Sequence, residues 1–177
     1  MKDGVYGIKS FLMKDASPNA FPTDWNDAFA LKAIVKDSLS YNDSAATEND
    51  IEVEDMDNFY ASLPSGLPTK GFTIQTYDMG EATYKHLCGY EKQSGGDWFE
   101  EKPGFELANQ AVQIITKAFG DFPSKTFEWA NMKTKVTRTG TIGKSGFPNF
   151  NIEFKQQSLI SAEGKEIAGA RWKNTGA

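Results

Sequence analysis

The largest group of side chains that could bind a metal ion is an acidic segment at residues 43–60. It contains no lysine, arginine or glycine, and its acidic residues are Asp43, Glu48, Asp50, Glu52, Glu54, Asp55 and Asp57. A calcium loop spaces its oxygen ligands around a glycine and closes with a glutamate, so this segment fails that motif. A loosely bound divalent ion stays open as an alternative. The charge pattern favours a solvated loop that becomes ordered against a basic partner surface.

The acidic segment also carries apolar side chains that a purely solvated loop does not need. These are Ile51, Val53, Met56, Phe59 and Tyr60. Their presence predicts that the segment packs against another surface, such as a second subunit.

A second segment, residues 140–145, ends in Gly143, Lys144 and Ser145, as a phosphate-binding loop does. That loop requires a glycine five residues before Gly143, where Arg138 stands, and a helix immediately afterwards. The glycine and proline within residues 146–148 disfavour a helix. The segment is therefore predicted to be a flexible turn between two strands.

The single histidine, His86, and the single cysteine, Cys88, do not form a catalytic or metal-binding pair. They lie two residues apart on a predicted helix, so their side chains point about 200° apart. Cys88 is expected to be a small buried side chain, and one cysteine allows no internal disulfide. Many carboxylates are present, but no pattern selects a glycosidase pair among them. We predict that the protein is not an enzyme and has no catalytic residue, metal site or cofactor.

Tryptophan is the remaining residue type whose side chain could bind a ligand. The four are Trp25, Trp98, Trp129 and Trp172. Their default interpretation is that they close the ends of a β-sandwich or barrel. Trp98 and Trp172 are expected in loops, where stacking on sugar rings is the alternative.

Composition narrows the class of protein. The chain has 177 residues, a net charge of −5 and a pI of about 5.0. This predicts a single domain without the basic surface of a nucleic-acid-binding protein. No apolar run is long enough to span a membrane, and no signal-peptide pattern follows Met1, so we expect a protein made in the cytoplasm that has no membrane partner.

Alternating apolar residues predict most of the strands. Phe150, Ile152 and Phe154 share one face of residues 149–156, and Phe72 and Ile74 do the same in 71–77. Residues 28–36 and, more weakly, 4–14 show the same pattern.

Two longer segments need further interpretation. Residues 126–139 alternate with a change of phase that a β-bulge near Ala130 or Asn131 would repair. Residues 106–119 fit a helix or a strand. Their β-branched residues favour a strand paired with 126–139 in a hairpin.

One helix is predicted at residues 79–88. Asp78 and Glu81 have the spacing of a capping box, and Gly89 stands where a helix commonly ends. The predicted fold is mainly β: an antiparallel β-sandwich or barrel with one short α-helix and long loops, forming a single domain over residues 1–177.

The order of these parts resembles the major tail tube protein of long-tailed bacteriophages, within the tail tube and type VI secretion tube superfamily. The resemblance covers about residues 4–160. It is carried by residues 70–78, the helix end at 87–90, residues 127–139 and the strand at 150–154.

The resemblance implies a structural virion protein without a catalytic motif. Six subunits would form a ring around a lumen, and stacked rings would form the tail tube that conducts the genome. The implied partners are further copies of the chain, the tape-measure protein, and the tail-tip and terminator proteins. DNA would pass through transiently and non-specifically, and the implied location is the virion tail of a phage whose proteins are made in the bacterial host cytoplasm.

The resemblance also suggests roles for particular segments. Residues 43–60 become a candidate inter-ring stacking loop, and residues 17–27 and 162–177 become candidate inter-subunit arms. The stacking-loop candidates are Asp50, Ile51, Val53, Met56, Phe59 and Tyr60. The candidate lumen-facing acids are Asp78, Glu128 and Glu153. The alternative function is a carbohydrate- or ligand-binding β-sandwich module. This alternative rests on the tryptophans and on the loosely bound divalent ion considered for residues 43–60.

Overall fold

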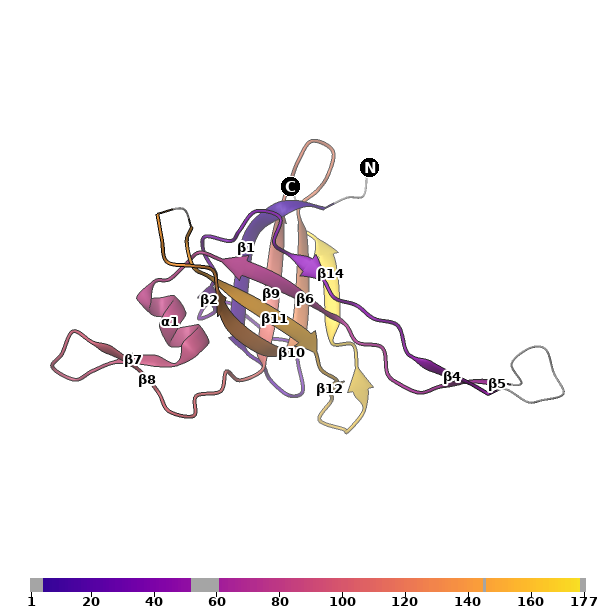
Figure 1. Cartoon of the computed structure of the whole chain (residues 1–177). Helices are drawn as coiled ribbons and strands as arrows, with labels where there is room; N and C mark the ends of the chain where they lie inside the picture. Colours follow the sequence, from indigo (N-terminus) through magenta and orange to yellow (C-terminus); the bar gives the residue numbers. More distant parts are fainter. Residues whose placement is uncertain (1–4, 52–60, 145, 176–177) are drawn as a thin grey trace.

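The computed structural model describes residues 5–51, 61–144 and 146–175 (Figure 1). Its main element is an eight-stranded antiparallel sheet in the order β2-β1-β9-β10-β11-β6-β3, with β14 also paired to β10. The strands are β1 (Tyr6–Asp15), β2 (Phe29–Ala30), β3 (Ser40–Tyr41), β6 (Gly71–Thr76), β9 (Gln110–Lys117), β10 (Lys125–Thr139), β11 (Asn149–Gln156) and β14 (Ala170–Asn174). The predicted fold class, mainly β with a short helix, is confirmed.

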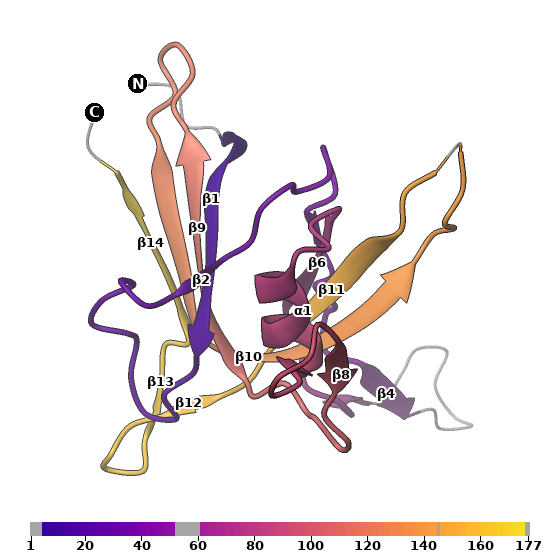
Figure 2. The same cartoon turned by 90° about the vertical axis from the view of Figure 1, so that its left-hand side faces the viewer.

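The long strand β10 divides the sheet into two halves that face each other (Figure 2). Its first part pairs with β9 and β14, and its second part, from Met132 onward, pairs with β11. The register with β9 shifts between Trp129 and Met132, which confirms the predicted bulge. A bulge bends its strand and increases the local twist. The bend folds one sheet into a sandwich-like arrangement, and the described strands leave it open between its end strands, β2 and β3.

The core fills the space between the two halves. Phe72 of β6 lies 4.8 Å from Phe154 of β11, 6.3 Å from Phe11 of β1 and 4.9 Å from Trp129 of β10, measured between ring centroids. Phe150, Ile152 and Phe154 are all buried, as their alternation predicts. Each fully buried side chain of this size stabilises the fold by roughly 1.5–3 kcal/mol. The strands predicted at 4–14, 71–77, 106–119, 126–139 and 149–156 are confirmed as β1, β6, β9, β10 and β11.

Helix α1 (Glu81–Cys88) follows β6 directly, as predicted, but it begins differently. The N-cap residue is Gly80, and no side chain caps the helix. Asp78 instead accepts hydrogen bonds from the Gly80 amide (3.0 Å) and the Thr83 hydroxyl (2.7 Å), so it holds the turn before the helix. The capping box predicted at Asp78 is therefore wrong. The predicted end is confirmed, because Gly89 has the left-handed φ of 67° that glycine tolerates best.

The strand predicted over residues 28–36 is mostly wrong. Only Phe29 and Ala30 pair with β1, because the backbone turns at Ala33 (φ 45°) and again at Asp37 (φ 57°). The backbone N–H of Leu31 donates a hydrogen bond to a carbonyl of β1, whereas the backbone N–H of Val35 donates one to a carbonyl of β6. The segment therefore crosses from one half of the sheet to the other.

Three small hairpins extend from this body (Figure 1). They pair β4 (Glu48–Ile51) with β5 (Ala61–Pro64), β7 (Tyr90–Lys92) with β8 (Phe99–Glu101), and β12 (Leu159–Ile160) with β13 (Glu166–Ile167). Among the described residues, no helix has both the length and the apolar character needed to cross a membrane.

Candidate functional site

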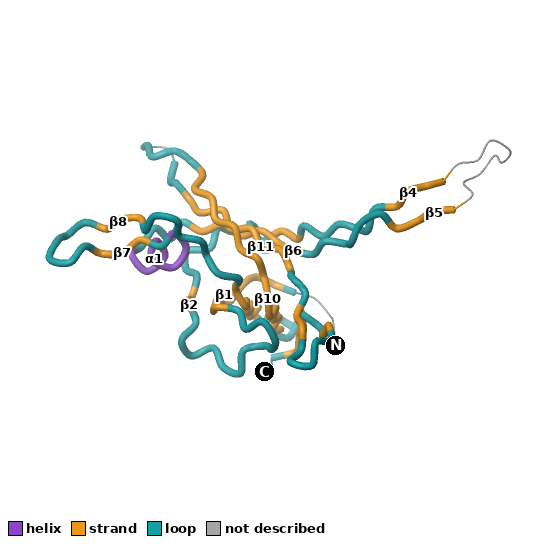
Figure 3. Tube along the Cα trace, turned by 90° about the horizontal axis from the view of Figure 1, so that it is seen from below, coloured by secondary structure: helices purple, strands orange, loops and turns teal. Residues whose placement is uncertain are grey.

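The part of the molecule that reaches furthest from the core is the ribbon that ends in β4 and β5 (Figures 1 and 3). The ribbon continues the pairing of β3 with β6. The backbone N–H of Asn42 donates a hydrogen bond to the Gly71 carbonyl, and Ser44 and Thr69 exchange backbone hydrogen bonds. Ile51 lies nine positions after Asn42 along the chain. At a strand rise of about 3.3 Å per residue the ribbon spans about 30 Å, which is about the diameter of a small domain.

The described end of this hairpin has an acidic face and an apolar face. Glu48 and Asp50 lie on one side, where the Ser62 hydroxyl is 2.9 Å and 2.6 Å from their carboxylates. Strand alternation places Ile51 and its neighbour Leu63 on the other side, where they are 40% and 53% exposed. An isolated two-stranded hairpin is at best marginally stable in water, so an apolar face of this kind needs a covering surface.

Two of the predicted stacking-loop residues, Asp50 and Ile51, lie on this hairpin and are exposed. The other four fall outside the described residues. They are Val53, Met56, Phe59 and Tyr60.

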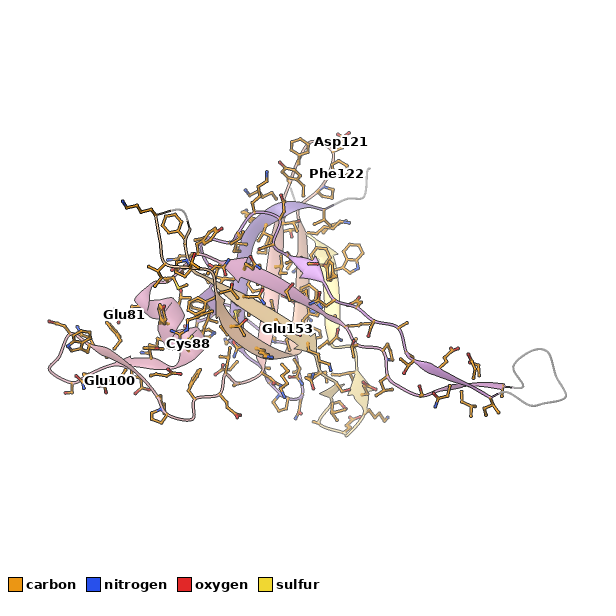
Figure 4. The ribbon with its side chains drawn as sticks, viewed as in Figure 1. Glu81, Cys88, Glu100, Asp121, Phe122 and Glu153 are labelled. Atoms are coloured by element: carbon orange, nitrogen blue, oxygen red, sulfur yellow. The ribbon has the colours of Figure 1, made fainter. Side chains whose placement is uncertain are left out.

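The three acids suggested for a lumen have three different environments. Glu153 is exposed on β11, Asp78 holds the turn before α1, and Glu128 of β10 is only 8% exposed. The structure therefore does not gather them on one solvent-facing surface. Of the three, Glu153, labelled in Figure 4, is the exposed one.

Glu128 organises a network of polar side chains. It accepts hydrogen bonds from the Arg171 guanidinium (2.6 Å), the Gln113 amide (2.7 Å) and the Trp25 indole (3.1 Å). Burial alone would raise the pKa of Glu128. The hydrogen bonds from Gln113 and Arg171, the charge of Arg171 and the bond from Trp25 outweigh burial and lower the pKa below its usual range. The folded structure therefore favours the charged form of the Glu128 carboxylate.

This network attaches both predicted arms to their own domain. Trp25 belongs to the segment 17–27, and Phe21 of the same segment lies 4.1 Å from the Arg171 guanidinium. Arg171 lies in β14, whose five residues pair with β10. The described portions of both segments therefore contribute to the fold of a single copy.

The exposed tryptophans do not close the ends of the sheet. Trp98 is 77% exposed in the turn between β7 and β8, and Trp172 is 60% exposed. Trp172 lies on strand β14 and not in the predicted loop, and the Lys125 ammonium lies 4.8 Å from its ring.

The surroundings of His86 and Cys88 indicate structural roles for both side chains. The His86 ring stacks on Phe29 at 4.3 Å, and burial lowers the pKa of His86 against a smaller opposite influence from Gln110 and Asp15. Burial raises the pKa of the Cys88 thiol. In the part of the chain that the structure describes, no three side chains of histidine, cysteine, aspartate or glutamate are grouped as metal ligands would be.

The tips of two turns carry exposed apolar residues. Residues 140–144 form a turn between β10 and β11, as predicted, in which Ile142 is 93% exposed and nearby Phe147 is 81% exposed. Asp121 and Phe122 lie at the end of the β9–β10 turn (Figure 4), where Phe119 stacks on Tyr6 at 4.6 Å.

Sequence reasoning missed an open groove of about 1080 Å³ between β1 and the crossing segment 31–41. Its floor includes Ile114 of β9 and Phe127 of β10. No sequence signal reveals this groove. It exists because Leu31 is hydrogen-bonded to β1 while Val35 is hydrogen-bonded to β6, so the backbone between them spans the two halves of the sheet.

No protein-family model matches this chain, and a search of curated proteins finds no match either. The fold and its surfaces are therefore the features from which a function can be inferred.

Proposed function

We propose that the chain is a structural subunit that assembles with copies of itself into stacked hexameric rings, forming the tail tube of a long-tailed bacteriophage. The observation that carries the proposal is the β4–β5 hairpin, which extends about 30 Å from the core and presents exposed Ile51 and Leu63. A monomeric protein gains nothing from an apolar surface held so far from its core. A subunit that must bridge to a neighbour does.

Two further features support the proposal. The resemblance implies two packed antiparallel sheets flanked by a helix, and the curved sheet with one helix after β6 is compatible with that arrangement. The net charge of −5 suits a conduit for DNA, since like charge keeps phosphates from adhering to the wall. In this proposal the tape-measure, tail-tip and terminator proteins are further partners, the virion tail is the location, and the genome passes without specific contacts.

Negative-stain electron microscopy of the concentrated chain tests the proposal. Hollow rings or tubes are the expected particles. Compact particles of single-subunit size at every concentration, with and without divalent ions, would contradict it.

A carbohydrate-binding module is the second candidate, favoured by one observation: Trp98 is 77% exposed at the base of the turn between β7 and β8. Sugar binding by this residue would be lost in Trp98→Ala and kept in Phe147→Ala, which removes an equally prominent aromatic ring. An array of immobilised glycans is the direct assay, and wild-type chain that binds none of them would remove this candidate.

A further inference from the structure

The open groove has the chemistry of a binding site for an acidic, apolar strand pair. Its floor is apolar and includes Ile8, Leu31, Ile34, Ile114 and Phe127. Its rim adds Tyr6 and Tyr41, which are 51% and 59% exposed. Exposed aromatic and aliphatic groups around a concave surface are typical of interfaces.

The groove is also basic on both walls. Lys9 and Lys117 stand on the β1–β9 side, and Lys32 and Lys36 stand on the crossing segment. All four are exposed, and none forms an ion pair with a described carboxylate. Among the described residues that line the groove, Asp37 is the single acid.

The hairpin has the complementary composition. From Asp37 to Thr69 the chain contains no lysine or arginine, and residues 43–64 contain seven acids. On the described part of the hairpin, Glu48 and Asp50 form one face, and Ile51 and Leu63 form the other. Its apolar face matches the groove floor, and its acidic face matches the lysines above it.

The hairpin cannot occupy the groove of its own chain. Tyr41 lines the groove, and the ribbon leaves the body at the next residue and points away from it (Figures 1 and 3). Folding back would break the hydrogen bonds that join Asn42 to Gly71 and Ser44 to Thr69. The occupant must therefore come from another molecule.

We propose that the groove between β1 and residues 31–41 receives the β4–β5 hairpin of a second copy of this chain. This inference rests on the proposed self-assembly and names its contact surfaces. Each copy offers one hairpin and one groove, so the contact is head-to-tail and leaves a free hairpin and a free groove at the ends of any chain of copies.

Side chains, and not a continued β-ladder, hold the hairpin in this proposal. The register of β1 with β9 shifts twice, between Tyr6 and Ile8 and between Ile8 and Ser10. Bulges at an edge interrupt the regular row of amides that a pairing strand needs. Specificity then comes from opposite charges and from the apolar floor.

Disulfide trapping tests the contact in the full chain. In a Cys88→Ser background, Ile51→Cys combined with Lys36→Cys gives every copy one thiol on the hairpin and one in the groove. Mild oxidation is expected to yield a ladder of dimers, trimers and larger species on a non-reducing gel. The matched control combines Ile51→Cys with Lys135→Cys, which lies on β10 outside the groove lining, and is expected to give no ladder.

Charge reversal provides an independent readout. Lys32→Glu with Lys36→Glu is expected to raise the concentration needed for assembly at least about tenfold, since like charges across an interface are strongly unfavourable. Adding Glu48→Lys and Asp50→Lys is expected to restore assembly. The control is Lys133→Glu with Lys155→Glu, a facing exposed pair on β10 and β11, which should leave assembly unchanged.

The outcomes separate the two proposals. Rings or tubes in the microscope without a ladder would overturn the hairpin-in-groove contact and leave the tube subunit standing. A ladder without rings or tubes would support the contact and overturn the tube. Neither ladder nor assembly would overturn both.

Discussion

At the scale of single residues, Glu128 shows how a carboxylate that the sequence offers for one role is used in another. Its three hydrogen bonds join β10 to β9, to β14 and to the segment containing Trp25. Removing the carboxylate leaves its hydrogen-bond donors unsatisfied, and an unsatisfied buried polar group costs roughly 1–3 kcal/mol.

Glu128→Ala is expected to lower the free energy of unfolding by about 2–3 kcal/mol, because it leaves Gln113 and Arg171 without their acceptor. Glu153→Ala is the matched control, since Glu153 is exposed on β11, and it should change stability by less than about 0.5 kcal/mol. Urea unfolding measures both. Equal losses in the two variants would contradict the role given to Glu128.

His86 makes a prediction about pH. Its pKa in the folded chain lies below the ordinary 6.5, so the unfolded chain binds the proton more readily. The contribution of His86 to the free energy of unfolding is therefore constant well above pH 6.5 and falls as the pH drops below that value. His86 is the only histidine, so His86→Gln should lack this slope between about pH 7 and about pH 5. Urea unfolding across the pH range gives the slope, and parallel slopes for the two proteins would contradict the account.

At the scale of elements, the end of α1 provides a test of local packing. Gly89 has a φ of 67°, and a Cβ at this position would collide with the Phe105 ring. Gly95 has a similar φ of 78° and open space around it. Gly95→Ala should cost about 1–2 kcal/mol from backbone strain alone, and Gly89→Ala should cost clearly more. Thermal unfolding compares them, and the reverse order would show that Phe105 is not held against the helix end.

The hairpin provides the second prediction at this scale. A variant in which Asn-Gly replaces residues 46–67 lacks the hairpin. Its Ala45 and Pro68 are joined by a two-residue turn that favours strand pairing. The melting temperature should stay within a few degrees of the wild type, because the main core cluster lies in the sheet and α1. Self-association should disappear. Circular dichroism and size-exclusion chromatography measure the two effects, and an unfolded variant would show that the hairpin supports the core.

The elements also show where sequence patterns succeed. The period-two pattern of β11 predicts its ends correctly, because both its buried and exposed faces follow strand geometry. The phase change in β10 predicts the bulge for the same reason. Residues 28–36 alternate equally well, yet the turn at Ala33 breaks the strand, since hydrogen bonds to two different strands decide the path there.

The candidate contact surfaces are only half predictable from the sequence. The acidic, apolar composition of residues 43–60 by itself indicates a contact loop. The groove is not predictable, because β1 and the crossing segment meet residues of β9 and β10 that lie about a hundred positions along the chain. Pairing over such distances leaves no periodic signal in the sequence.

At the scale of the whole molecule, one copy combines a folded body with a projecting hairpin and an open groove. Charge attraction between hairpin and groove is screened by salt, whereas apolar contact is not. Raising the salt concentration from about 0.05 M to about 0.5 M should weaken self-association without abolishing it. Sedimentation velocity follows this change, and association that strengthens steadily with salt would show that charge opposes the contact.

The most direct test of the central claim is the mass of the particles in solution, measured by light scattering for the wild-type chain and for the Asn-Gly hairpin replacement at equal concentration. We predict that the wild type reaches at least six times its 19.6 kDa subunit mass and that the replacement stays at the mass of one subunit. A wild type that remains at one subunit at every concentration, or a replacement that assembles as well as the wild type, would contradict the account.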